Sequence, residues 1–289
     1  MKANYIREMV MKVIFFIAAC ASVLAVILIC VFLFANGIPA MGEIGFLDFL
    51  LGTEWRPSND IYGILPMILG SIYVTAGAII LGVPIALLTA IFLAYFCPKK
   101  IYKICKSGIN LMAGIPSVVY GFFGLVLLVP MIKSIFNVRS GATMLTASIL
   151  LAIMVLPTII SVTEASLQSV PQSYYEGALA LGATHAQSVF FTMIPAAKSG
   201  IVTGIVLGIG RVIGETMAVI MVAGNQAVMP ESLLAGVRTM TANIVLEMGY
   251  ASGLHREALI ATGVVLFVFI LIINLIVAAL KRGAIQHGD

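Results

Sequence analysis

The sequence has little charge for its length. Asp, Glu, Lys and Arg make up only 10% of its 289 residues, whereas 61% are hydrophobic and the mean hydropathy is +1.14. A folded domain in water needs a far more charged surface than this composition supplies. The composition therefore excludes a soluble globular protein and predicts an all-α, polytopic membrane protein.

Residues that build metal sites and disulfide frameworks are also scarce. The chain has four cysteines without CxxC spacing and three scattered histidines, namely Cys20, Cys30, Cys97, Cys105, His185, His255 and His287. Neither pattern is typical of a metal site or of a disulfide framework. We therefore expect this chain to bind no metal or cofactor of its own.

Signatures of nucleotide and nucleic-acid binding are missing as well. The sequence contains no GxxxxGK[ST] phosphate loop, so ATP and Mg²⁺, if they drive this protein, must bind to another chain. The formal net charge of +4 is largely the positive bias expected on one side of a membrane protein. It indicates no nucleic-acid partner.

Six apolar stretches are long enough to cross a bilayer, which takes about 20 residues as a helix. They cover residues 13–34, 61–96, 107–132, 142–163, 200–224 and 258–280. The second stretch is unusually long and uncharged, which predicts a long helix that is tilted, or broken near Pro66 and Gly82–Pro84. We expect residues 1–289 to form a single transmembrane domain with six helices.

The distribution of Lys and Arg predicts the orientation of these spans. With six spans both termini lie on one side, and that side receives ten of the lysines and arginines, against five on the other side. Positive residues are enriched in short cytoplasmic loops. We therefore expect both termini, and the long loop at residues 164–198, to lie in the cytoplasm.

Two segments on the opposite side carry amphipathic residues. Trp55, the only tryptophan, precedes the second span, and an anchor in the lipid headgroup zone is one interpretation of it. Residues 231–248 place apolar side chains at helical spacing, which predicts an amphipathic helix on or in the membrane surface. Such a helix could form a gate or simply pack at the interface.

The fifth span contains the only ionisable residues that lie deep in a predicted helix, Arg211 and Glu215. A charge at the bilayer centre costs about 2.5–3.5 kcal/mol on insertion scales. On an uninterrupted helix, residues four apart can pair, and Gly204 and Gly208 would fall on the same face as Arg211 and Glu215. Glycines on such a face allow a close helix contact or leave room for a small solute.

Two interpretations of this face stay open from the residues alone. The charges and glycines could form a packing seam between helices. Alternatively, Arg211 binds an oxyanion with its planar fork of donors. Glu215 would then accept a hydrogen bond from protonated phosphate, which sulfate cannot donate at neutral pH, or it would only hold Arg211 in place.

The long polar interruption at residues 164–198 contains a distinctive spacing. Glu176 is followed by Ala178, by Gly182 six residues after the glutamate and by Pro195 nineteen residues after it. This spacing resembles the EAA loop of binding-protein-dependent ABC permeases, which docks into the ATPase subunit. The departures from the usual pattern are small or similar-sized changes at Gly177, Thr192 and Ile194.

Two further segments extend this resemblance over nearly the whole chain. Residues 62–71 (YGILPMILGS) open the second span, and residues 211–218 (RVIGETMA) lie in the fifth. Together with the loop they resemble the PstC-type permease subunit of bacterial phosphate ABC importers. The fifth span of the sister PstA-type subunit is recognisably similar. The resemblance therefore indicates phosphate as the substrate more strongly than it distinguishes a PstC-type from a PstA-type subunit.

The resemblance implies a type I ABC importer permease fold in the bacterial cytoplasmic membrane. It implies a PstA-type permease partner, two ATPase subunits that bind ATP and Mg²⁺, and an extracytoplasmic phosphate-binding protein. Short helices around Gly182 would couple to the ATPase, with Glu176, Ala178 and Pro195 in the same motif. Arg211 and Glu215 would line the route of phosphate.

Two rival functions are weaker. A secondary transporter or channel would use Arg211 and Glu215 without ATP, and it would be active as the purified chain, but it leaves the EAA-type loop unexplained. An intramembrane enzyme would need a second polar cluster at membrane depth. The spans offer no base partner beyond Glu215.

Overall fold

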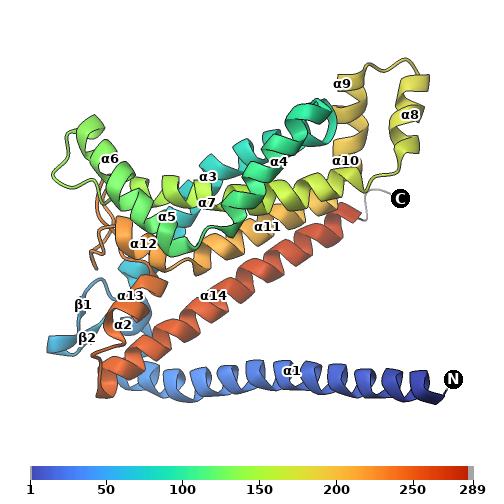
Figure 1. The fold of residues 1–289 in the computed structure, drawn as a ribbon. Coiled ribbons are helices and arrows are strands. Elements are labelled where there is room, and N and C mark those ends of the chain that lie inside the picture. The colour runs from blue at the N-terminus through green and yellow to red at the C-terminus, as the bar shows by residue number, and fades with distance from the viewer. Residues whose placement is uncertain (1, 286–289) are drawn as a thin grey trace.

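The computed structural model describes residues 2–285, with side chains placed for residues 7–276. Over this range the chain is mostly helical (Figure 1). Five of the described helices are long and apolar enough to cross a membrane, and a bent pair of helices raises this number to six. The all-α, multi-span class predicted from the composition is confirmed.

The elements follow one another with few long connections. They are α1 (Lys2–Ile44), α2 (Phe46–Leu51), β1 (Trp55–Arg56), β2 (Ile61–Tyr62), α3 (Leu65–Ile91), α4 (Lys99–Gly114), α5 (Ser117–Phe123), α6 (Val129–Phe136), α7 (Met144–Gln168), α8 (Gln172–Ala180), α9 (His185–Ser188), α10 (Ile194–Ala196), α11 (Lys198–Gly214), α12 (Met217–Val222), α13 (Met240–Glu247) and α14 (Gly253–Ile285). Short π-helical segments extend α3 (Phe92–Phe96), join α5 to α6 (Gly124–Leu128) and join α9 to α10 (Val189–Met193).

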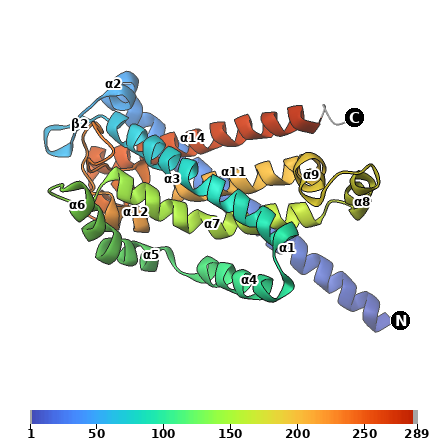
Figure 2. The ribbon, with the colours of Figure 1, turned by 90° about the horizontal axis from the view of Figure 1, so that it is seen from above.

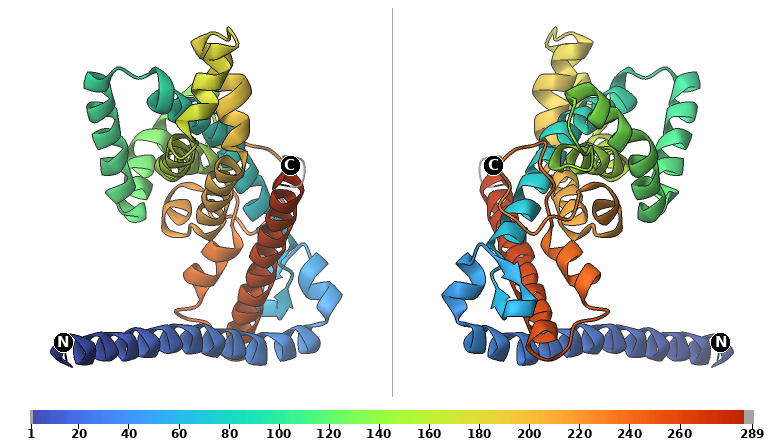
Figure 3. Two further views of the ribbon diagram at one scale, coloured as in Figure 1. Left: turned by 90° about the vertical axis from the view of Figure 1, so that its right-hand side faces the viewer. Right: turned by 90° about the vertical axis from the view of Figure 1, so that its left-hand side faces the viewer.

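Helix α7 is the centre of the bundle. It packs against α3 on one side and against α11 on another, and its apolar side chains are almost completely buried, including Leu150, Val155 and Ile159. Helix α1 instead contacts α14 near the β1–β2 end and diverges from the bundle over the rest of its length (Figures 1 and 3). Most apolar side chains of α1 are therefore exposed in the single chain.

The two ends of the bundle differ in character. The N-terminal end of α1, the C-terminal end of α14 and the α8–α9 hairpin lie toward one end, and β1, β2, α2, α6 and α13 lie toward the other (Figures 1 and 2). The start of α1 and the end of α14 therefore lie toward the same end as the α8–α9 hairpin.

The second predicted span starts later than expected and is not broken at its prolines. Residues Ile61–Tyr62 pair with Trp55–Arg56 as a two-stranded antiparallel ribbon, so the helix begins at Leu65. Pro66 occupies the first turn of α3, where its missing N–H costs no hydrogen bond. The helix also runs through Pro84 without interruption.

The third predicted span, residues 107–132, is wrong at both ends. Helix α4 ends at Gly114, because Ile115 and Pro116 are extended and the residue before a proline avoids the helical conformation. The membrane-length segment starts afterwards and covers Ser117–Phe136. The separate helix α4 carries four lysines, Lys99, Lys100, Lys103 and Lys106.

Three other boundaries need correction. The fourth helix, predicted over residues 142–163, continues to Gln168 and so takes the first residues of the predicted loop 164–198. The fifth span, residues 200–224, is two helices, α11 and α12. The predicted amphipathic helix over residues 231–248 is helical only at Met240–Glu247, since the preceding residues form an irregular connection. The first and sixth predicted spans, 13–34 and 258–280, lie within α1 and α14.

Candidate functional site: the interrupted fifth span

Two glycines bring α11 close to α7. A Cβ atom on Gly208 would lie 2.8 Å from side-chain atoms of Ile159 and 2.9 Å from Val155. A Cβ atom on Gly204 would lie 3.0 Å from the hydroxyl of Thr163. Because both glycines face α7 at this distance, they form a helix-packing seam. These contacts favour the packing interpretation over room for a solute at these two positions.

The helix stops between the two charged residues of the fifth span. Glu215 follows the last residue of α11 and is extended, with φ −70° and ψ 129°. Its carboxylate accepts a hydrogen bond from the backbone N–H of Ala218 at 3.2 Å, and its carbonyl accepts one from the Thr241 hydroxyl. Glu215 therefore fixes the start of α12 instead of continuing the face of α11.

The expected Arg211–Glu215 pair is absent among the residues that the structure describes. The prediction assumed a continuous helix, and the break at Glu215 removes the i, i+4 geometry. Arg211 is exposed in the single chain, and its Nη1 donates to the hydroxyl of Thr158 in α7 at 3.0 Å. An intramembrane guanidinium is thus left with most of its donors unused within the described chain.

The EAA-type segment folds into a helical hairpin (Figure 1). Glu176 and Ala178 lie in α8, and Gly182 ends it with φ +89°, a conformation that favours glycine. A capping box of Thr184 and Gln187 then starts α9. The short helices expected around Gly182 are therefore present.

Pro195 lies in α10, at the other end of the same segment. Between it and α9 the chain is π-helical, and the helices His185–Ala196 and Lys198–Gly214 meet at a bend of 69°. Glu176 is exposed, as are most residues of the hairpin. The segment therefore presents a surface beyond the bundle and continues directly into the helix that carries Arg211.

His185 joins the hairpin to the end of α3, a contact that the sequence did not reveal. Its Nδ1 lies 2.7 Å from the Tyr175 hydroxyl of α8, and its ring meets that of Phe96 edge-on with 4.8 Å between centroids. Phe96 belongs to the last turn of the second span. A movement of the hairpin would therefore act directly on the end of α3.

Glu164 anchors α4 to α7. The sequence placed it in a loop, but it lies inside α7 and is 1% exposed. Its carboxylate accepts hydrogen bonds from the Tyr102 hydroxyl at 2.7 Å and from Lys106 Nζ at 2.6 Å. Lys106 of α4 thus has a structural role beyond orienting the chain.

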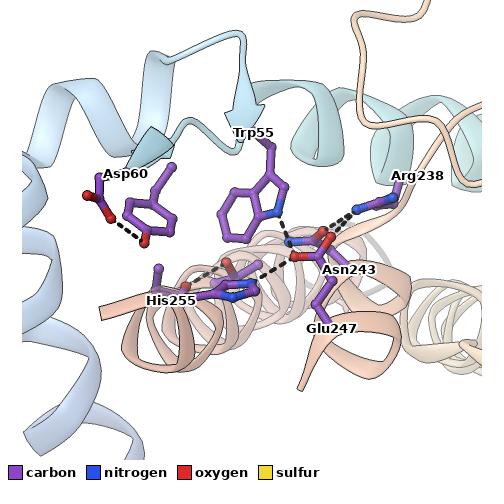
Figure 4. A network of polar contacts seen from close by, with 9 residues as sticks. Trp55, Asp60, Arg238, Asn243, Glu247 and His255 are labelled. Atoms are coloured by element: carbon purple, nitrogen blue, oxygen red, sulfur yellow. Dashed lines mark hydrogen bonds and ion pairs between the residues drawn. The ribbon is translucent and has the colours of Figure 1, made fainter. Parts of the chain in front are cut away.

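The opposite end holds a second buried carboxylate, Glu247 (Figure 4). It accepts hydrogen bonds from Trp55 Nε1 at 2.9 Å and from Arg238 Nη1 at 2.6 Å, and His255 Nε2 lies 2.9 Å away. Arg238 also donates to the side chain of Asn243. We call these five residues the outer network; it ties β1, the connection before α13, α13 and α14 together.

Trp55 is therefore no headgroup anchor: its side chain is buried and its N–H is used inside the protein. The ring packs edge-on against Tyr62 of β2. Burial raises the pKa of the Tyr62 phenol, and its hydrogen bond to the Asp60 carboxylate raises it further. Both effects favour the neutral phenol, which donates to Asp60.

These features together define a class of protein: a multi-pass membrane protein with an interrupted span and a helical hairpin at one end. A sequence profile described as "Binding-protein-dependent transport system inner membrane component" matches residues 82–286. The chain belongs to this family.

Curated relatives match over most of their length. The chain is 37% identical over 270 residues to the probable ABC transporter permease protein YqgH of Bacillus subtilis, covering 89% of this chain and 87% of that one. It is 34% identical over 292 residues to the phosphate transport system permease protein PstC of Mesorhizobium japonicum, covering 93% and 88%.

Solved structures confirm the fold. A bacterial alginate ABC transporter in complex with its periplasmic protein matches with a TM-score of 0.64, 17% identity and coverage of 92% of this chain and 94% of that one. An inward-facing form of the MetNI methionine ABC transporter matches with a TM-score of 0.61, 19% identity and coverage of 80% and 99%. The predicted importer-permease fold is confirmed.

Proposed function

We propose that this chain is the membrane permease subunit of an ATP-driven importer of inorganic phosphate and forms half of its translocation pathway. The observation that carries the proposal is Arg211, a guanidinium inside a predicted span whose only hydrogen bond within the described chain goes to Thr158. A planar fork of donors suits a tetrahedral oxyanion. The likeness to proteins named for phosphate transport supports the same anion.

Glu215 gives the proposed pathway a preference for protonated anions. One carboxylate oxygen, Oε1, accepts the Ala218 N–H, and Oε2 has no hydrogen-bond donor in the described part of the chain. Phosphate at neutral pH carries an O–H that this oxygen can accept, whereas sulfate would bring only lone pairs to it. The repulsion of a bare dianion would then work against sulfate.

The coupling hairpin, residues 172–196, receives the force of ATP binding in this proposal. Two ATPase subunits, which hold ATP and Mg²⁺, contact it around Glu176, Ala178 and Gly182. A PstA-type permease subunit completes the pathway in the bilayer, and an extracytoplasmic phosphate-binding protein delivers phosphate at the end with the outer network. Both termini and the hairpin lie in the cytoplasm.

Reconstitution of the complete complex in liposomes tests the function. We expect phosphate uptake that requires ATP, the ATPase subunits and the binding protein. Uptake by the permease subunits without ATPase, driven only by an ion or phosphate gradient, would contradict the proposal and identify a secondary transporter or channel.

Gly182→Pro tests the coupling assignment. Proline fixes φ near −65°, which is incompatible with the +89° at this position, so the turn between α8 and α9 must change. We expect an assembled complex whose ATPase activity is no longer stimulated by the loaded binding protein. Gly177→Ala is the matched control, because Gly177 lies in α8 and an added Cβ meets no atom within 4 Å. Normal stimulation in Gly182→Pro would exclude the hairpin as the coupling element.

A further inference from the structure

Thr158 lies in a membrane-length helix, and the hydrogen-bond partner of its hydroxyl is an arginine. Hydroxyls in such helices commonly donate to the carbonyl four residues earlier. In this chain that bond is made by Ser71, Thr89, Ser166, Thr203 and Thr262. The Thr158 hydroxyl makes no such bond to Met154 within the described residues; it accepts from Arg211 Nη1 at 3.0 Å instead.

The packing of α7 against α11 sets this contact. Gly208 allows α11 to approach Val155 and Ile159 of α7, and Arg211 lies almost one turn beyond Gly208. A side chain at position 208 would separate the helices and carry the guanidinium away from Thr158. The glycine seam and the Thr158–Arg211 hydrogen bond are therefore parts of one arrangement.

We infer that Thr158 is a positioning residue for the anion pathway: it holds one guanidinium nitrogen of Arg211 so that the remaining donors face the passing anion. The Thr158 oxygen accepts from Arg211, which leaves its own O–H directed away from the guanidinium and available to a second anion oxygen. Thr158 is half-buried, at the edge of the surface on which Arg211 is exposed. This inference rests on the proposed function, since it concerns the same site.

Substitution of Thr158 in the complete, reconstituted complex tests the inference. Thr158→Val keeps the shape but removes the acceptor, and Thr158→Ser keeps the hydroxyl. At saturating phosphate-loaded binding protein we expect about a tenfold fall in phosphate uptake per ATP hydrolysed for Thr158→Val. The KM for the loaded binding protein should not change, and Thr158→Ser should restore uptake.

Thr89→Val is the matched control, because Thr89 is also half-buried in a membrane-length helix but donates to the Ile85 carbonyl. It should transport like the wild type. Equal uptake by Thr158→Val and the wild type would overturn the role of Thr158. Equal losses of uptake in Thr158→Val and Thr158→Ser would overturn it too. Either result would leave the proposed function standing. No ATP-dependent phosphate uptake by the wild-type complex would overturn the proposed function, and this inference with it.

Discussion

The charged residues of the outer network and of the interrupted fifth span differ in burial and in their hydrogen-bond partners. Glu247 is 7% exposed and has partners on three sides, from Trp55, Arg238 and His255. Arg211 has one hydrogen bond within the described chain and is exposed on the bundle surface. A buried charge with a full set of partners holds elements together. A charge left with unused donors at membrane depth is instead available to a ligand.

Loss of Glu247 should give the largest effect on stability. Glu247→Ala leaves Arg238 without its carboxylate and the Trp55 N–H without an acceptor, and breaking a buried ion pair in this way costs about 3–5 kcal/mol. We expect a marked fall in the thermal unfolding temperature of the purified complex in detergent.

Glu54→Ala is the control for that measurement. Glu54 pairs with Arg56 at 3.5 Å, but the two side chains are 53% and 62% exposed, so the pair contributes less than about 1 kcal/mol. Similar unfolding temperatures for the two variants would show that the outer network does not hold this end of the molecule together, and the contrast with Arg211 would disappear.

Glu215→Gln should have a smaller effect, confined to anion selectivity. The amide keeps an oxygen but loses the negative charge, which weakens both the acceptance of a phosphate O–H and the repulsion of sulfate. We expect discrimination to fall by about 1.5–3 kcal/mol, the contribution of a hydrogen bond to a charged group. The measurement is inhibition of phosphate uptake by sulfate in the reconstituted complex.

Arsenate is the control anion for Glu215→Gln, because it carries a proton at neutral pH as phosphate does. Its inhibition of uptake should change little in the variant. An unchanged effect of sulfate would reduce Glu215 to its structural contact with Ala218 at the start of α12.

Much of this arrangement could be predicted from the sequence. Long uncharged stretches identify membrane helices because the bilayer demands about 20 apolar residues. The spacing of Glu176, Gly182 and Pro195 located the hairpin, and the rarity of charge in the spans singled out Arg211. These signals are local, and local patterns fix the existence of an element better than its ends.

The errors arose where tertiary contacts decide the outcome. At Glu215 only part of the cause is distant in sequence: the carboxylate contact to the Ala218 N–H is local, whereas the Thr241 hydroxyl that binds the Glu215 carbonyl comes from a separate segment. The outer network joins Trp55 to Glu247 across 192 positions, beyond any periodic pattern. Ile115–Pro116 is the exception: the residue before proline disfavours helix, and this signal could have placed the break before the third span.

Phosphate uptake by Arg211→Ala tests the central claim most directly. The variant should be measured in the reconstituted complex, with assembly and ATP hydrolysis checked, beside Arg139→Ala, which removes an exposed arginine from the connection before α7. The account predicts an assembled, ATP-hydrolysing complex in which Arg211→Ala no longer takes up phosphate while Arg139→Ala does. Normal uptake by Arg211→Ala would contradict it and place the route of the anion elsewhere.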